Sequence, residues 1–89
     1  MSWAVQIDPR VEKELRKLDQ STVRRVVAFL KKRASEEDDP RSQGIALKEN
    51  RFKGMWRYRV GDTRVIVQLD DAKKQITVLH VADRKEVYD

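Results

Sequence analysis

Residues 55–69, MWRYRVGDTRVIVQL, contain two alternating segments that Gly61-Asp62 separates. Successive side chains of a strand point to opposite faces of a sheet, so this alternation predicts two strands joined by a tight turn. Each segment has one apolar face: Trp56, Tyr58 and Val60 in the first, and Val65, Val67 and Leu69 in the second. The stretch therefore predicts an antiparallel pair with one face turned toward a core.

The other face of this pair carries arginine. Arg57 and Arg59 alternate with the apolar residues of the first segment, and Arg64 does so in the second. Pairing across the turn brings the three guanidinium groups to one side of the sheet. Because a guanidinium presents planar donors that fit phosphate oxygens, this face is a candidate phosphate-binding surface. The alternative is an ordinary solvated strand face, where arginine is common.

The N-terminal third predicts a strand followed by two helices. Trp3–Ile7 is prone to form a strand, and Asp8-Pro9 is typical of a helix start, with aspartate as the cap. The first helix has an apolar stripe, Val11, Leu15 and Leu18, with Arg10, Lys13, Glu14 and Lys17 expected to face water. Asp19 or Ser21 caps the second helix, whose apolar face is Val23, Val26, Val27, Leu30 and Ala34. The two helices are expected to form an antiparallel hairpin.

The C-terminal half predicts three antiparallel strands. A loop follows Pro40 and runs to about residue 51, with Ile45 and Leu47 expected to contact the core. The strands are expected at about 54–60, 63–70 and 75–81, and the third is apolar on both faces. Residues 1–89 are thus expected to form one α+β domain of order β-α-α-β-β-β, in which the first strand and the helical hairpin pack on an antiparallel sheet.

Composition narrows the chemistry. The chain of 89 residues has no cysteine and carries a net charge of +5, which excludes disulfides and favours a polyanionic or acidic partner. Its apolar runs are too short to span a membrane, and no signal peptide is expected, so we expect a cytoplasmic protein without membrane contact. Its single histidine, His80, is expected to be structural. No zinc site, catalytic triad or Gly-rich phosphate loop is predicted, and the acidic run 36–39 is expected to face water. We therefore expect no metal and no small-molecule cofactor.

The whole chain resembles the RelE/ParE superfamily of toxins from type II toxin–antitoxin systems. The resemblance rests on the helical segment KELRKLD, the block KGMWRYRVGDTRVIVQLDD and the ending VADRKEVYD. The middle block is similar to the family's strand pair, in which two basic residues flank an apolar residue and an arginine follows the turn. The ending is similar to the family's closing segment from arginine to Val-Tyr. The resemblance implies the RelE-like, microbial ribonuclease-type fold.

The RelE-like branch implies a toxin that cuts mRNA in the ribosomal A site and so inhibits translation. Such an endoribonuclease needs no metal. By position, the resemblance implies that the catalytic residues are Arg57, Arg59, Arg64, Arg84 and Tyr88. The arginines are expected to orient and neutralise the phosphate, and Tyr88 to stack on a base or transfer a proton. Three further cations, Arg51, Lys53 and Lys85, are expected to contact RNA.

Two alternatives stay open. ParE-like members share the fold but act on DNA gyrase without cleaving RNA. The other alternative is a family member that binds its antitoxin but has lost its activity. Asp83 suggests it, because this acidic residue stands before Arg84 where many relatives have a basic residue. In each case the resemblance implies a cognate antitoxin, and the basic residues Arg24, Arg25, Lys31 and Lys32 suit an acidic partner segment as well as they suit a solvated helix face.

Overall fold

The predicted hairpin lies within the sheet. The computed structural model describes residues 2–35, 39–48 and 50–83, and in it β3 (Trp56–Val60) pairs antiparallel with β4 (Thr63–Asp70). Gly61 turns the chain between them with φ +60°, a conformation that glycine adopts without steric cost. β5 (Gln75–Asp83) pairs antiparallel with the other side of β4. The three predicted strands and their antiparallel order are confirmed.

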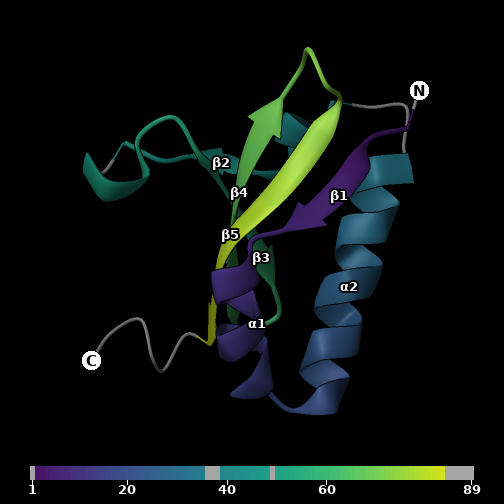
Figure 1. Ribbon diagram of the computed structural model, residues 1–89, viewed down its shortest axis with the longest axis vertical. Coiled ribbons are helices and arrows are strands. Elements are labelled where there is room, and N and C mark those ends of the chain that lie inside the picture. The colour runs from purple at the N-terminus through teal and green to yellow at the C-terminus, as the bar shows by residue number, and fades with distance from the viewer. Residues whose placement is uncertain (1, 36–38, 49, 84–89) are drawn as a thin grey trace.

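Two edge strands complete a five-stranded mixed sheet of order β1-β5-β4-β3-β2 (Figure 1). β1 (Ala4–Ile7) joins it parallel to β5, so the sheet is not wholly antiparallel. β2 (Ile45–Ala46) pairs with β3 where a loop was predicted. Ile45 does not contact the core as expected but is 56% exposed. The reason is its register: Ile45 lies opposite Arg57 and shares that residue's face. Leu47 is buried, as predicted.

Both helices begin at the predicted caps. The Asp8 side chain accepts the backbone N–H of Arg10 at 2.9 Å at the start of α1 (Pro9–Arg16). Asp19, rather than Ser21, accepts the N–H of Thr22 at 2.7 Å in the first turn of α2 (Gln20–Ser35). Two short 3-10 helices follow, η1 (Pro40–Gln43) and η2 (Asn50–Phe52). Among the described residues, no helix is both long and apolar enough to cross a membrane.

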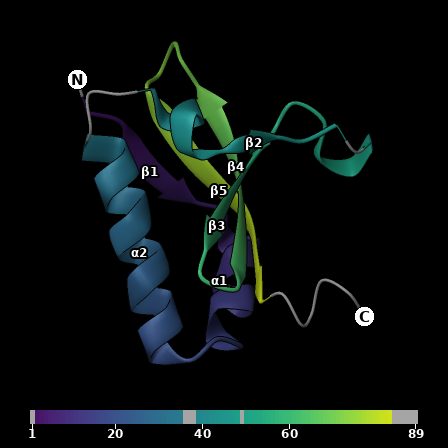
Figure 2. The ribbon, with the colours of Figure 1, turned by 180° about the vertical axis from the view of Figure 1, so that it is seen from behind.

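Figures 1 and 2 show from two opposite sides how the helices are arranged around the sheet. α2 runs beside the sheet next to β1, and α1 lies at the end of β1, where it packs on β5. The segment between β2 and β3, which carries η2, extends to the side opposite α2. α1 and η2 therefore border the sheet from different directions.

The core lies between the helices and one face of the sheet. The predicted stripes supply Val11 from α1 and Val26, Leu30 and Ala34 from α2, and the sheet supplies Tyr58, Val65, Val67, Ile76, Val78 and Val81. Fully burying one such aliphatic side chain contributes about 1.5–3 kcal/mol. One core neighbour was not predicted: Arg33 is buried, with its guanidinium 5.0 Å from the centre of the Phe29 ring.

Tyr58 links the sheet, helix α2 and the loop after it. Its side chain is fully buried, its ring centre lies 5.3 Å from that of Phe29, and its hydroxyl donates a hydrogen bond to the Pro40 carbonyl at 2.9 Å. Gly44 passes so close that a Cβ there would stand 3.2 Å from the ring. Burial raises the pKa of the Tyr58 phenol to about 12.

We predict that Tyr58→Phe lowers the free energy of unfolding at pH 8 by about 1–3 kcal/mol, because the Pro40 carbonyl loses its buried partner. The phenol pKa is higher in the folded than in the unfolded chain, so the neutral phenol stabilises the fold below pH 10. That contribution is lost as the pH rises toward 12. Urea unfolding from pH 8 to 12 should therefore show the difference between wild type and Tyr58→Phe shrinking. A difference that is constant across this range would contradict the prediction.

Candidate functional site

Strand pairing collects the predicted arginines on the face of the sheet that α2 does not cover. Arg59 lies directly opposite Arg64, and Arg57 lies opposite Ile66. On its other side, Ile66 pairs with His80 of β5. Arg57, Ile66 and His80 thus form one row across the sheet, with Arg59 and Arg64 in the next row. We call this surface the arginine face.

The arginine face concentrates positive charge. Arg59 is exposed, whereas Arg57 and Arg64 are half-buried. The Nε of Arg57 is buried and has no hydrogen-bond partner among the residues that the structure describes. Like charges directly opposite one another destabilise a sheet, and the Arg59–Arg64 pair is such an arrangement. Guanidinium groups bind phosphate through charge-assisted hydrogen bonds, so this face offers donors that suit a phosphate.

The other predicted site residues divide into two groups. Arg51 and Lys53, in and after η2, are exposed, and the Arg51 guanidinium lies 5.0 Å from the centre of the Phe52 ring. Arg84, Lys85 and Tyr88 lie outside the described residues. Asp83 itself lies opposite Thr63 at the end of β5.

An irregularity in β5 places His80 on the arginine face. Ile66 pairs with His80, but the next residue, Val67, pairs with Val78, so Leu79 is an extra residue. Strict alternation would put His80 on the same side as Val78, beneath the helices. The one-residue bulge reverses this, as bulges do when they re-aim a side chain. The signal is visible in the sequence, because the apolar positions change phase between Val78 and Leu79.

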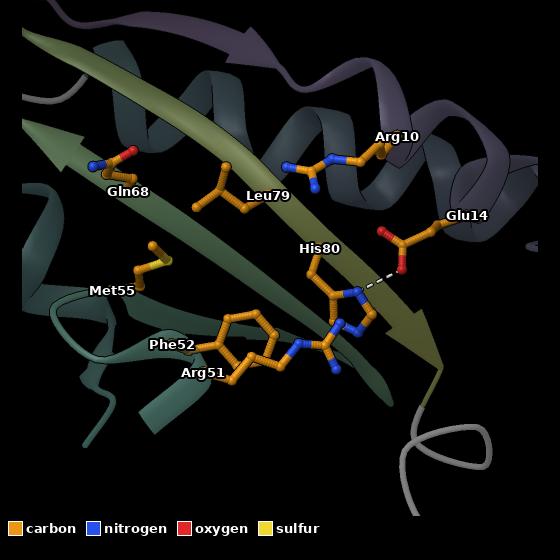
Figure 3. Close-up of a pocket in the computed structure, with 8 residues that line it drawn as sticks. All are labelled: Arg10, Glu14, Arg51, Phe52, Met55, Gln68, Leu79 and His80. Atoms are coloured by element: carbon orange, nitrogen blue, oxygen red, sulfur yellow. Dashed lines mark ion pairs between the residues drawn. The ribbon is translucent and has the colours of Figure 1, made fainter. Parts of the chain in front are cut away.

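Beside the arginine face lies a groove of about 390 Å³ (Figure 3). Its walls come from α1, from the segment around η2, and from β4 and β5. The lining residues are Arg10, Glu14, Arg51, Phe52, Met55, Gln68, Leu79 and His80. The groove is bordered by basic, aromatic and acidic side chains together, and of the predicted site residues within the described ranges, Arg51 alone lines it.

Glu14 reaches across from α1 to the sheet. One oxygen of its carboxylate lies 2.5 Å from Nδ1 of His80 (Figure 3). The other oxygen accepts the backbone N–H of Val81 at 3.2 Å. The expectation that Glu14 faces water is therefore wrong. Helical periodicity places it beside the apolar stripe, but only the packing of α1 on β5 shows what it meets. His80, expected to be structural, lines the groove with 27% of its side chain exposed.

Aromatic stacking continues along the groove wall. The Phe52 ring stacks on His80 with ring centres 5.9 Å apart and planes inclined by 24°. Arg10, on the opposite wall, is hydrogen-bonded through its side chain to Asp8, which lowers the pKa of the Asp8 carboxyl. Aromatic rings bordered by guanidinium groups are typical of surfaces on which unpaired bases stack.

Several solved toxin structures share this fold. A toxin–antitoxin complex, RelBE2, from Mycobacterium tuberculosis superposes with a TM-score of 0.82 at 24% identity, covering 94% of this chain and 100% of that one. The RelE–RelB complex of Pyrococcus horikoshii superposes with a TM-score of 0.74 at 30% identity, covering 94% of this chain and 97% of that one. A variant of E. coli RelE in the free state superposes with a TM-score of 0.73 at 20% identity, covering 99% of this chain and 92% of that one.

The sequence comparison agrees with the fold. No curated protein sequence matches the chain. The profile of a family described as "ParE toxin of type II toxin-antitoxin system, parDE" matches residues 5–88, almost the whole chain. The α+β fold with its mixed sheet, and this match, confirm the predicted superfamily. The chain belongs to the RelE/ParE superfamily, as a toxin of a type II toxin–antitoxin system.

Proposed function

We propose that this toxin cleaves mRNA in the A site of cytoplasmic ribosomes and thereby inhibits translation. One observation carries the proposal: strand pairing sets Arg57, Arg59 and Arg64 together on the face of the sheet opposite α2. This face adjoins a groove that stacked aromatic rings border. The combination suits an RNA phosphate with its neighbouring base.

For this reaction the protein mainly has to position the RNA and neutralise charge on its phosphate. The 2′-oxygen attacks the adjacent phosphorus, the bond from phosphorus to the 5′-oxygen breaks, and the 5′-oxygen takes up a proton. The attacking hydroxyl must be held in line, and the charge that develops on the phosphate must be neutralised. Arg57, Arg59 and Arg64 supply that charge. By resemblance, Arg84 and Tyr88 complete the catalytic set, and Arg51, Lys53 and Lys85 hold the flanking RNA.

An antitoxin is the second partner that we propose. The solved RelBE2 and RelE–RelB structures are toxin–antitoxin complexes. In this chain, α2 exposes a row of basic side chains, Arg24, Arg25, Lys31 and Lys32. An acidic, amphipathic segment suits such a surface.

We predict that Arg64→Ala lowers the rate of mRNA cleavage in translating ribosomes by about 10²–10³-fold, the usual loss when one charge-stabilising donor is removed. Arg57→Ala should act in the same direction. Arg24→Ala is the matched control, because it removes the same charge from an exposed position on α2. Primer extension on ribosome-bound mRNA measures the rate. Unchanged cleavage by Arg64→Ala would reject the proposed site.

The same preparation tests the second candidate, inhibition of DNA gyrase, which the match to the ParE profile favours. Wild-type protein that blocks supercoiling but leaves ribosome-bound mRNA intact would replace the proposed function with this one. Mapping RNA ends in cells soon after induction gives the complementary test, because the proposed function requires cuts confined to translated reading frames.

We also predict that Arg59→Ala weakens binding of a short single-stranded RNA mainly at low salt. Removing one ion pair between a guanidinium and a phosphate reduces the slope of log affinity against log salt by about 0.7. Fluorescence anisotropy at several salt concentrations measures the slope, with Arg24→Ala again as the control. Equal slopes for wild type and Arg59→Ala would show that this guanidinium does not bind a phosphate.

A further inference from the structure

The arginines by themselves do not supply one chemical function that RNA cleavage requires. The attacking 2′-hydroxyl must give up its proton, and arginine is a poor acceptor because it stays protonated below about pH 12. Imidazole, by contrast, ordinarily changes charge between about pH 5 and 8. The chain has one histidine, and the structure places it on this face.

We infer that His80 is the proton acceptor for RNA cleavage and that Glu14 is its positioning residue. This inference rests on the proposed function and extends it. In the reaction, Nε2 of His80 takes the proton of the 2′-hydroxyl while the 2′-oxygen forms its bond to phosphorus. The bond from phosphorus to the 5′-oxygen breaks, and the leaving 5′-oxygen takes up a proton from water. The products are a 2′,3′-cyclic phosphate and a 5′-hydroxyl.

The contacts of Glu14 define the state of the imidazole. An ionised carboxylate only accepts hydrogen bonds, and Glu14 already accepts one from the Val81 N–H at 3.2 Å. Nδ1 of His80, 2.5 Å from the other carboxylate oxygen, must therefore carry a hydrogen. In the neutral ring this leaves Nε2 as the acceptor, and Nε2 is turned away from Glu14 (Figure 3).

The surroundings hold the ring in this orientation. Phe52 stacks on it with planes inclined by 24°, and Glu14 holds both the ring and the backbone of the next residue. The carboxylate comes from α1 and the imidazole from β5, so two packed elements set their distance rather than one mobile loop. A base held by a second group is the arrangement that activates hydroxyl nucleophiles in many hydrolases.

His80 is also near enough to the phosphate-binding arginines. Arg64 pairs with Ala82, two residues along β5 from His80, which makes Arg64 and His80 diagonal neighbours. Such neighbours have Cβ atoms about 7–8 Å apart, within reach of long side chains. A phosphate held by Arg64 thus brings the adjoining ribose to the mouth of the groove, where His80 lies. Among the residues that the structure describes, the charged groups that face His80 are Glu14 and Arg10 from α1, Arg51 from η2, Arg57 from β3 and Arg64 from β4.

Single-turnover cleavage of ribosome-bound mRNA tests the inference. We expect His80→Ala to lose about 10²–10⁴-fold in rate, the usual contribution of a positioned acid or base. Added imidazole should restore part of this loss, in proportion to the concentration of its neutral form. The wild-type rate should rise with pH as imidazole loses its proton and then level off, and His80→Gln should lack this rise.

Glu14 has a matched control on the same helix. Glu14→Gln should lower the rate less than His80→Ala does and should change the pH profile, because the amide no longer holds Nδ1–H as strongly. Glu12→Gln makes the same chemical change at an exposed position of α1, and it should leave the rate and profile unchanged. Far-UV circular dichroism and thermal unfolding confirm that each variant is folded.

The outcomes separate this inference from the function on which it rests. If wild type cleaves mRNA and His80→Gln does so at the same rate with the same pH profile, His80 is not the acceptor and the proposed function stands. A folded His80→Ala variant that is slow but does not respond to imidazole would also overturn the role of His80. Wild-type protein that cleaves no ribosome-bound mRNA would instead overturn the proposed function itself.

Discussion

The burial of one face of β3, β4 and β5 against the helices is the constraint on which the rest of this structure depends. Tyr58, Val65 and Val78 must point toward Val26 and Leu30 to escape water, and the period of a strand then sends every second residue the other way. The arginines therefore reach the face opposite α2 as a consequence of core packing. A one-residue slip of either strand would expose the core and bury the guanidinium groups at once.

The groove is assembled beside this sheet from elements that are distant in the sequence. α1 contributes Glu14, η2 contributes Phe52 and Arg51, and β5 contributes His80. Contacts tie α1 and η2 to β5: Glu14 accepts the backbone N–H of Val81, and Phe52 stacks on His80. A chain of this size has little room for an enclosed pocket. This chain instead has a shallow groove beside a charged face of its sheet.

The loop between α2 and β3 is held by polar contacts as well as apolar ones. Tyr58 donates to the Pro40 carbonyl, and Arg41 makes a two-point contact with Asp71 in the turn before β5, at 3.0 and 2.6 Å. The hydrogen bonds from Arg41 lower the pKa of the Asp71 carboxyl. These contacts fasten one end of the segment that carries η2, and therefore the wall of the groove that Phe52 forms.

The sequence by itself determined the two helices, the strands β1, β3, β4 and β5, and the sides that β3 and β4 present. Asp8-Pro9 and Asp19 mark the helix starts, and the alternation around Tyr58 and Arg57 separates core from surface, because caps and periodicity are local properties. Only the tertiary structure decided that β1 lies parallel to β5, that Ile45 faces outward, and that Glu14 meets His80. The last contact needs both the packing of α1 on β5 and the extra residue Leu79, which turns His80 from the core side to the groove. A local sequence pattern cannot predict how far apart two elements lie, because their packing in the folded chain sets that distance.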